Sequence, residues 1–334
     1  MDRFDVPVVL FTFKRIIPTR MVMEVIAKVK PTSLYIFADG ARNSVEGENE
    51  KVLEVREYIK KAIDWDCEKN IFFSEFNKGC DRNIREGLDK VFSEKERAIV
   101  LEDDAVPTES FFYYCRELLD RYQEDKRIQF IGGYNAVGND SKISGSYAFS
   151  KTPPMNGAIA TWADRWNNCD FDLKNWPENK RKNRFDSLYF SGELRKRYIE
   201  YFELSYEKKS TAWDYIFLHD MLDKDRFGIV PKNNLVTSYG FMDGAYHPQR
   251  KDETERFKEM MTASEIEEVY PIKAYPEVTR NEAYDRMRQD KLLAVRGSFI
   301  KRRILDVYLL IKNVAYNKLP RKHWNMLKKI IVRK

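Results

Sequence analysis

The chain has 334 residues, of which 43% are hydrophobic and 34% charged, and its formal net charge is +6. That composition is typical of a soluble globular protein with one large α/β core or two smaller ones. The four cysteines form no C-x-x-C pair, which excludes a zinc site of that spacing, and no apolar run approaches the ~20 residues that cross a bilayer. Because the first residues are polar and lead directly into a strand pattern, we expect no signal peptide and a cytosolic protein with free thiols.

The first 130 residues alternate strand and helix patterns. Apolar, β-branched runs predict strands at 6–13, 33–38, 70–74 and 98–101. Charged or amphipathic stretches predict helices at 18–30, 48–62, 81–92 and 109–124. This alternation indicates a mostly parallel sheet flanked by helices, with ligands beyond the carboxyl ends of the strands. We therefore expect one group of strand-end side chains to converge: Lys14, Arg15, Asp39, Asn77, Asp103 and Asp104.

The remainder of the chain is less regular. Glycines and aromatic residues up to about residue 183 predict loops and short strands, and helical patterns return at 192–205 and 212–222. No repeat, low-complexity segment or linker divides the chain. We expect one unit made of two halves, 1–130 and 131–285, followed by a basic helical appendage at 286–334.

Three adjacent carboxylates, Glu102, Asp103 and Asp104, follow a buried strand directly. Their mutual repulsion and desolvation require compensation, which a Mg²⁺ or Mn²⁺ ion on a diphosphate supplies. The alternative is that one of the aspartates caps the helix that begins near Thr108. Position and triple charge together favour the metal site.

Other strand-end residues carry weaker signals. Asp39 can accept from a ribose or a base, or can simply form the Asp-Gly turn. Lys14 and Arg15 can face a diphosphate or be solvated surface charges. The stretch from Asn77 to Arg82 places a glycine turn and an arginine at a helix start, where anions are favoured.

Asp214 and His247 are the two candidates outside the first half. Asp214 is flanked by Trp213 and Tyr215, so desolvation can make it a general base, although it can equally stabilise the first helical turn. His247 lies in an irregular loop, where a histidine is either a metal or phosphate ligand or a structural residue. No nucleophile elbow, Walker loop, H-E-x-x-H pattern or G-x-G-x-x-G fingerprint is present, which gives a dehydrogenase little support.

These motifs come in an order that resembles bacterial GT-A glycosyltransferases, in the group similar to N-acetylglucosaminyltransferase I. The resemblance covers roughly residues 6–250. It rests on six short segments: residues 7–12, Ala38-Asp39-Gly40, Asn77-x-Gly79-Cys80, Leu101-Glu102-Asp103-Asp104, Ser110-Phe111-Phe112 and Thr161-Trp162.

The resemblance implies a Rossmann-like GT-A fold and an inverting transfer from a nucleotide-sugar. Asp104 would hold Mn²⁺ or Mg²⁺ on the donor diphosphate, with His247 as a further metal ligand, and Asp214 would be the base. Residues 1–130 would bind the donor and 131–285 the acceptor. The donor contacts implied in the first half are Phe11, Thr12, Arg15, Asp39, Asn77, Arg82, Glu102 and Asp103.

Two segments depart from the pattern of this group. The acceptor region reads Asn156-Gly-Ala-Ile-Ala-Thr-Trp162, without two tryptophans of the usual Trp-Gly-Trp-Ala-Thr-Trp. The segment that closes over the diphosphate reads Ala245-Tyr246-His247-Pro248, where Ala-Thr-His-Thr is more usual. The first change suggests an altered sugar pocket.

The basic charge is concentrated at the end of the chain. From Asp290 to Lys334 there are 13 Lys/Arg and 2 Asp/Glu, a net +11, whereas the other 289 residues carry 46 basic and 51 acidic groups, a net −5. Apolar residues near helical spacing in this tail favour a helix on an anionic membrane surface, with packing on the body or nucleic-acid binding as alternatives. The acidic body argues against a nucleic-acid protein. We expect a cytoplasmic enzyme, peripheral at the inner face of the membrane.

The resulting hypothesis is a metal-dependent glycosyltransferase of bacterial surface polysaccharide or lipopolysaccharide synthesis, with a UDP-sugar donor by default and a glycan or lipid-linked acceptor. One alternative is a sugar-nucleotide nucleotidyltransferase, but residues 11–15 lack the expected glycine-rich loop. Another is a non-catalytic carbohydrate-binding protein at a membrane surface.

Overall fold

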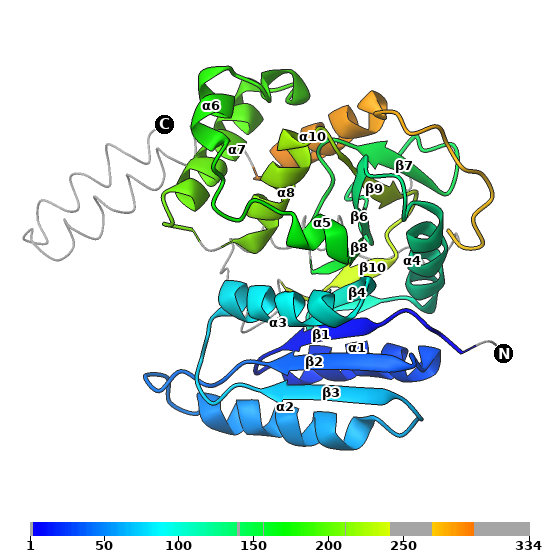
Figure 1. Cartoon of the computed structure of the whole chain (residues 1–334), viewed down its shortest axis with the longest axis vertical. Helices are drawn as coiled ribbons and strands as arrows, with labels where there is room; N and C mark the ends of the chain where they lie inside the picture. Colours follow the sequence, from blue (N-terminus) through cyan, green and yellow to red (C-terminus); the bar gives the residue numbers. More distant parts are fainter. Residues whose placement is uncertain (1–2, 139–140, 156, 211, 241–268, 297–334) are drawn as a thin grey trace, which may run out of the picture. The chain divides into compact units, whose positions relative to one another are not determined.

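A computed structural model describes residues 3–138, 141–155, 157–210, 212–240 and 269–296 (Figure 1). Its centre is an eight-stranded sheet in the order β3-β2-β1-β4-β8-β6-β9-β7, and a small second sheet pairs β5 with β10. The strands are β1 Val8–Thr12, β2 Ser33–Ala38, β3 Glu68–Phe73, β4 Arg97–Glu102, β5 Ala105–Pro107, β6 Ile128–Gly132, β7 Tyr147–Ser150, β8 Ala158–Trp162, β9 Phe227–Pro231 and β10 Val236–Ser238.

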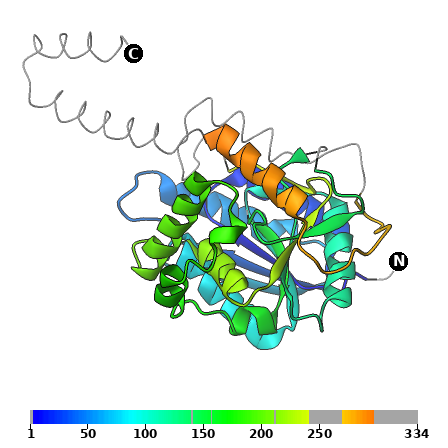
Figure 2. The same cartoon turned by 90° about the horizontal axis from the view of Figure 1, so that it is seen from above.

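Helices cover both faces of the sheet (Figure 2). In one layer α1 packs against α2 and α4, and in the other α3 packs against α5 and α8. The helices are α1 Ile16–Val29, α2 Glu48–Ala62, α3 Cys80–Glu94, α4 Glu109–Arg121, α5 Ala163–Asn167, α6 Trp176–Arg181, α7 Gly192–Tyr206, α8 Trp213–Asp223 and α10 Glu282–Arg296. None of the helices among the described residues is both long and apolar enough to cross a bilayer.

The core strands explain why this arrangement forms. Every residue of β1, β2, β6 and β8 is buried, as expected of apolar strands that have helices on both faces. The pairs β1–β2, β2–β3, β1–β4 and β6–β9 are parallel, whereas β4–β8, β6–β8 and β7–β9 are antiparallel. The predicted α/β fold with a mostly parallel sheet is thus confirmed, and the antiparallel β8 in its middle is an addition.

The irregular segment predicted up to about residue 183 contains more order than its sequence suggested. Strand β8 lies between β4 and β6, and the helices α5 and α6 follow it. The strand is apolar and fully buried, although the residue before it, Gly157, has a φ of +61°. A glycine there lets the chain enter β8 against the end of β4.

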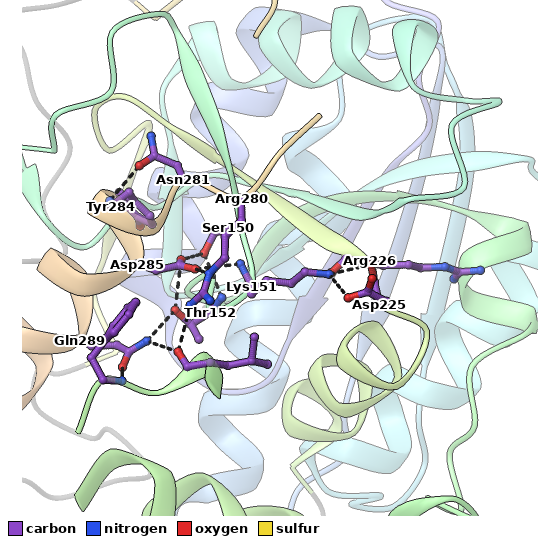
Figure 3. A network of polar contacts seen from close by, with 12 residues as sticks. Ser150, Lys151, Thr152, Asp225, Arg226, Arg280, Asn281, Tyr284, Asp285 and Gln289 are labelled. Atoms are coloured by element: carbon purple, nitrogen blue, oxygen red, sulfur yellow. Dashed lines mark hydrogen bonds and ion pairs between the residues drawn. The ribbon is translucent and has the colours of Figure 1, made fainter. Parts of the chain in front are cut away.

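A buried polar network joins α10 to the residues around the end of β7 (Figure 3). The carboxylate of Asp285 accepts hydrogen bonds from Ser150 Oγ, from Thr152 Oγ1 at 3.2 Å and from Arg280 Nε at 2.8 Å. Asn281 caps the helix, because its Oδ1 accepts from the backbone N–H of Tyr284 at 2.9 Å. These contacts fix the start of α10 on the sheet.

The chain divides into two compact units, Met1–Lys291 and Leu292–Lys334. Helix α10 runs across residue 286, where the sequence suggested that the appendage begins. The predicted membrane-binding tail lies mostly at 297–334, outside the described residues. The division at 130, 285 and 334 stays a prediction.

Candidate functional site

The site lies where the order of the strands reverses. Strand β1 pairs in parallel with β2 on one side and with β4 on the other, so the chain moves outward to β3 and then returns beside β1. The register pairs Phe11 with both Phe37 and Glu102, which brings the carboxyl ends of the three strands to one level. Open α/β sheets bind their ligands at such a switch point.

Arg15 and the two aspartates after β4 meet at this edge. Arg15 Nη2 lies 2.6 Å from Asp103 Oδ1 and 2.8 Å from Asp104 Oδ2. The backbone N–H of Phe13 also donates to Asp103 Oδ2 at 3.2 Å. Burial raises the pKa of Asp103 to about 6, although the Arg15 charge opposes this shift. Arg15, Asp103 and Asp104, which were predicted to converge, are therefore in direct contact.

Glu102 is the most perturbed carboxyl of the cluster. Its side chain packs on Gly157, where an added Cβ would come 3.0 Å from Glu102 Cβ. Burial, together with the charges of Asp104 and Asp214, raises the pKa of Glu102 to about 8. The charge of Asp214 is thus close enough to act on Glu102, which associates the base candidate with the acidic cluster.

Asp81 at the start of α3 lies near the start of α8, a neighbourhood that sequence reasoning missed. Its carboxylate approaches the backbone N–H of Trp213, at the first position of α8, without normal hydrogen-bond geometry, and its buried Oδ1 has no partner among the described residues. Burial raises the pKa of Asp81 to about 6, partly offset by Arg85. A carboxylate at a helix N-terminus is stabilised by the helix dipole. The only sequence signal was an acid next to Cys80 in a glycine-containing turn.

Asp39 holds the loop after β3. Its Oδ1 accepts from the backbone N–H groups of Gly40 and Lys78, each at 2.8 Å. Its Oδ2 accepts from Gly79 N at 3.0 Å and from Asn77 Nδ2 at 3.1 Å. A carboxylate has about four acceptor positions. These contacts assign Asp39 and Asn77 to shaping the loop, and nucleotide contact by either stays a prediction.

The other donor candidates lie at the margin of this cluster. Phe11 is 5% exposed, and its ring stacks on Phe37 with 5.3 Å between the centroids, so it belongs to the core. Arg82 is solvent-exposed and pairs with Glu86 at 2.6 Å. The buried hydroxyl of Thr12 has no hydrogen-bond partner among the described residues. Of these three, Thr12 is the residue left with an unused polar atom at the strand end.

The donor atoms around Asp104 fit a hard divalent cation. Its carboxylate is 23% exposed and lies near the buried Tyr134 hydroxyl, which approaches Ser238 without normal hydrogen-bond geometry. No set of three His, Cys, Asp or Glu side chains in the described part of the chain is arranged as a complete metal cage. Magnesium and manganese are commonly bound by one or two carboxylates, water and phosphate oxygens. The other predicted ligand, His247, lies outside the described residues.

Comparisons with known proteins give similarity to solved structures only. No protein-family model and no curated protein sequence matches the chain. Among solved structures, the chain is similar to the mannosyltransferase PcManGT from Pyrobaculum calidifontis in complex with GDP-Man and Mn²⁺, at 11% identity and a TM-score of 0.40. The alignment covers 98% of this chain and 84% of that one. At this level of similarity, the function has to be inferred from the residues of the site.

Proposed function

We propose that the protein is a GT-A glycosyltransferase that transfers a sugar from a nucleotide-diphosphate donor to a hydroxyl group. The observation that carries this proposal is the contact of Arg15 with Asp103 and Asp104 at the switch point. An arginine supplies a diphosphate partner, and the carboxylates supply a cation site beside it. One edge of the sheet thus provides both a guanidinium for the diphosphate and carboxylates for a cation that would bind the diphosphate.

On the donor side, Asp104 would hold Mn²⁺ or Mg²⁺ against the diphosphate, with His247 as the further ligand suggested by the sequence. When bound, the cation supplies compensation for the charge that develops on the leaving diphosphate. Arg15 donates hydrogen bonds to the same diphosphate. Glu102 is the third carboxyl of the cluster, at the end of β4, and the charges of Asp104 and Asp214 both act on it. Its protonated form, favoured by a pKa of about 8, can donate to a sugar oxygen.

On the acceptor side, Asp214 is the general base. It takes the proton of the acceptor hydroxyl while that oxygen forms a bond to the anomeric carbon. The bond from this carbon to the diphosphate oxygen breaks in the same step, so the configuration inverts. Helix α3 packs against α8, the helix that carries the base, and so supports its position.

The setting of the reaction follows from the charge distribution. A basic tail of net +11 after a body of net −5 supports attachment to an anionic membrane surface. A lipid-linked or glycan acceptor of bacterial surface polysaccharide synthesis would meet the enzyme there, at the cytoplasmic face. A UDP-sugar is the donor that we would test first.

A thermal-shift screen tests the donor site. Wild type, Asp104→Asn and the control Asp120→Asn are heated with nucleoside diphosphates and nucleotide-sugars, with and without Mn²⁺. Asp120 is a matched control because it is an exposed aspartate that pairs with Arg97, at the amino end of β4 and away from the carboxyl ends of the strands. At 100 times its Kd a ligand stabilises by about 2.7 kcal/mol. Metal-dependent stabilisation by one base in wild type and Asp120→Asn, but not in Asp104→Asn, is expected. No shift with any nucleotide would refute the proposal.

A further inference from the structure

We infer that Arg15 is an exchangeable counter-ion, which neutralises Asp103 and Asp104 until the donor arrives and then moves to its diphosphate. This inference rests on the proposed function, and it adds an order to binding: the cation binds well only together with the nucleotide. Arg15 Nη2 alone reaches both carboxylates, at 2.6 and 2.8 Å. The guanidinium therefore stands where a cation on Asp104 would stand.

The two aspartates depend on Arg15 to different degrees. Asp103, with 6% of its side chain exposed, keeps the backbone N–H of Phe13 as a second partner when Arg15 leaves. The Asp104 carboxylate is 23% exposed and has no side-chain partner besides Arg15 within the described ranges. Departure of the guanidinium thus leaves Asp103 satisfied and Asp104 open to a cation.

The Arg15 side chain can move while its backbone stays in place. The carbonyl of Arg15 accepts from Thr19 Oγ1 at 2.7 Å and from Thr19 N at 3.3 Å, which ties the backbone to the first turn of α1. Nε and Nη1 of Arg15 make no hydrogen bond to any residue that the structure describes. The unused donors suit a bidentate contact with phosphate oxygens.

Binding of metal and nucleotide then has to be cooperative. A divalent cation alone must displace a guanidinium from the carboxylates or bind beside it, and both are unfavourable because the charges are alike. A diphosphate supplies a new partner for Arg15 and extra ligands for the cation. Such coupling is reciprocal, and it is commonly about 5- to 150-fold.

The experiment measures Mn²⁺ binding by titration calorimetry and by the electron paramagnetic resonance of free Mn²⁺, with and without UDP and GDP. The proteins are wild type, Arg15→Gln and the control Arg20→Gln. Arg20 is also an arginine of α1, but it lies over the ring of Tyr58. Arg15→Lys is the second variant in case Arg15→Gln does not fold, since lysine keeps the positive charge but lacks the planar guanidinium group that can make two parallel hydrogen bonds.

In wild type and Arg20→Gln, we expect a nucleoside diphosphate to tighten Mn²⁺ binding by about 30-fold. Arg15→Gln should bind Mn²⁺ alone about tenfold more tightly than wild type, and most of the coupling to the nucleotide should disappear. Arg15→Lys should lie between the two. Equal Mn²⁺ affinity and equal coupling in wild type and Arg15→Gln would overturn the counter-ion role while leaving the proposed donor site intact. Absence of Mn²⁺ binding in every variant, with or without nucleotide, would overturn both.

Discussion

Replacement of His219 by phenylalanine should remove a large part of the acid sensitivity of the fold. His219 lies on α8 with 1% of its surface exposed, and its ring makes edge contacts with Trp176, Phe185 and Phe202. Neither ring nitrogen has a hydrogen-bond partner among the described residues. Burial lowers the pKa of His219 from 6.5 to about 4, although the charges of Asp223 and Asp220 oppose this shift. The folded protein therefore holds this imidazole neutral, whereas the unfolded chain protonates it below pH 6.5.

The sign follows from the protons bound in each state. Between pH 6.5 and about 4 the unfolded chain binds more protons at this position than the folded protein does. The stability that the folded state gains from the neutral His219 is therefore present above pH 6.5 and is lost as the pH falls towards 4. The lowering of the His219 pKa from 6.5 to about 4 corresponds to about 3 kcal/mol in the free energy of unfolding. Most of this, about 2–3 kcal/mol, should be lost between a pH of about 7.5 and a pH of about 4.5.

The assay is guanidinium denaturation of wild type and His219→Phe over that pH range. The pKa values of Glu102, Asp103 and Asp81 are raised, so these groups contribute stability that is lost as the pH rises. Their contributions are common to both proteins and cancel in the difference in unfolding free energy between wild type and His219→Phe. Phe202→Leu is the control, because it disturbs the same cluster without a titratable group. If the difference between wild type and His219→Phe does not change with pH, the histidine is not held neutral by burial and the reasoning is refuted.

Three further predictions concern the site and its support. Asp214→Asn should lower the transfer rate by about 10²- to 10⁴-fold while the thermal shift by the donor is kept; lost donor binding would contradict its role as base. Gly240→Ala should weaken Mn²⁺ binding in the presence of nucleotide, because its Cβ would come 2.8 Å from Asp104 Oδ2, whereas Gly192→Ala, with nothing within 4 Å, should not. Asp285→Ala should destabilise the fold by about 3–5 kcal/mol in urea denaturation, since it leaves the part-buried Arg280 without its carboxylate partner; a loss under about 1 kcal/mol would contradict the anchoring of α10.

Local sequence patterns predicted strands β1 to β4 and helices α1 to α4, but not the strands β5 and β6. The β-branched run at 33–38 and the charged periodic stretch at 48–62 have the bounds of β2 and α2 as observed. Such patterns are reliable because burial on both faces of a strand, or along one stripe of a helix, acts on neighbouring residues. The same patterns did not predict that β8 runs antiparallel between β4 and β6, because strand order depends on contacts between distant segments.

For the candidate site, the sequence suggested a chemistry that stays a prediction, and the tertiary structure decided which residues are partners. A strand that ends in three acids, together with Arg15 after another strand, was enough to predict an anion and cation site at the edge of the sheet. Sequence could not show that Arg15 contacts those acids, that the Asp39 carboxylate accepts hydrogen bonds from residues 77–79, or that α3 packs against α8. Residue type and strand position are local properties and can be read along the chain, whereas charge pairing and hydrogen bonding depend on distances of a few ångströms between segments that only the folded chain brings together.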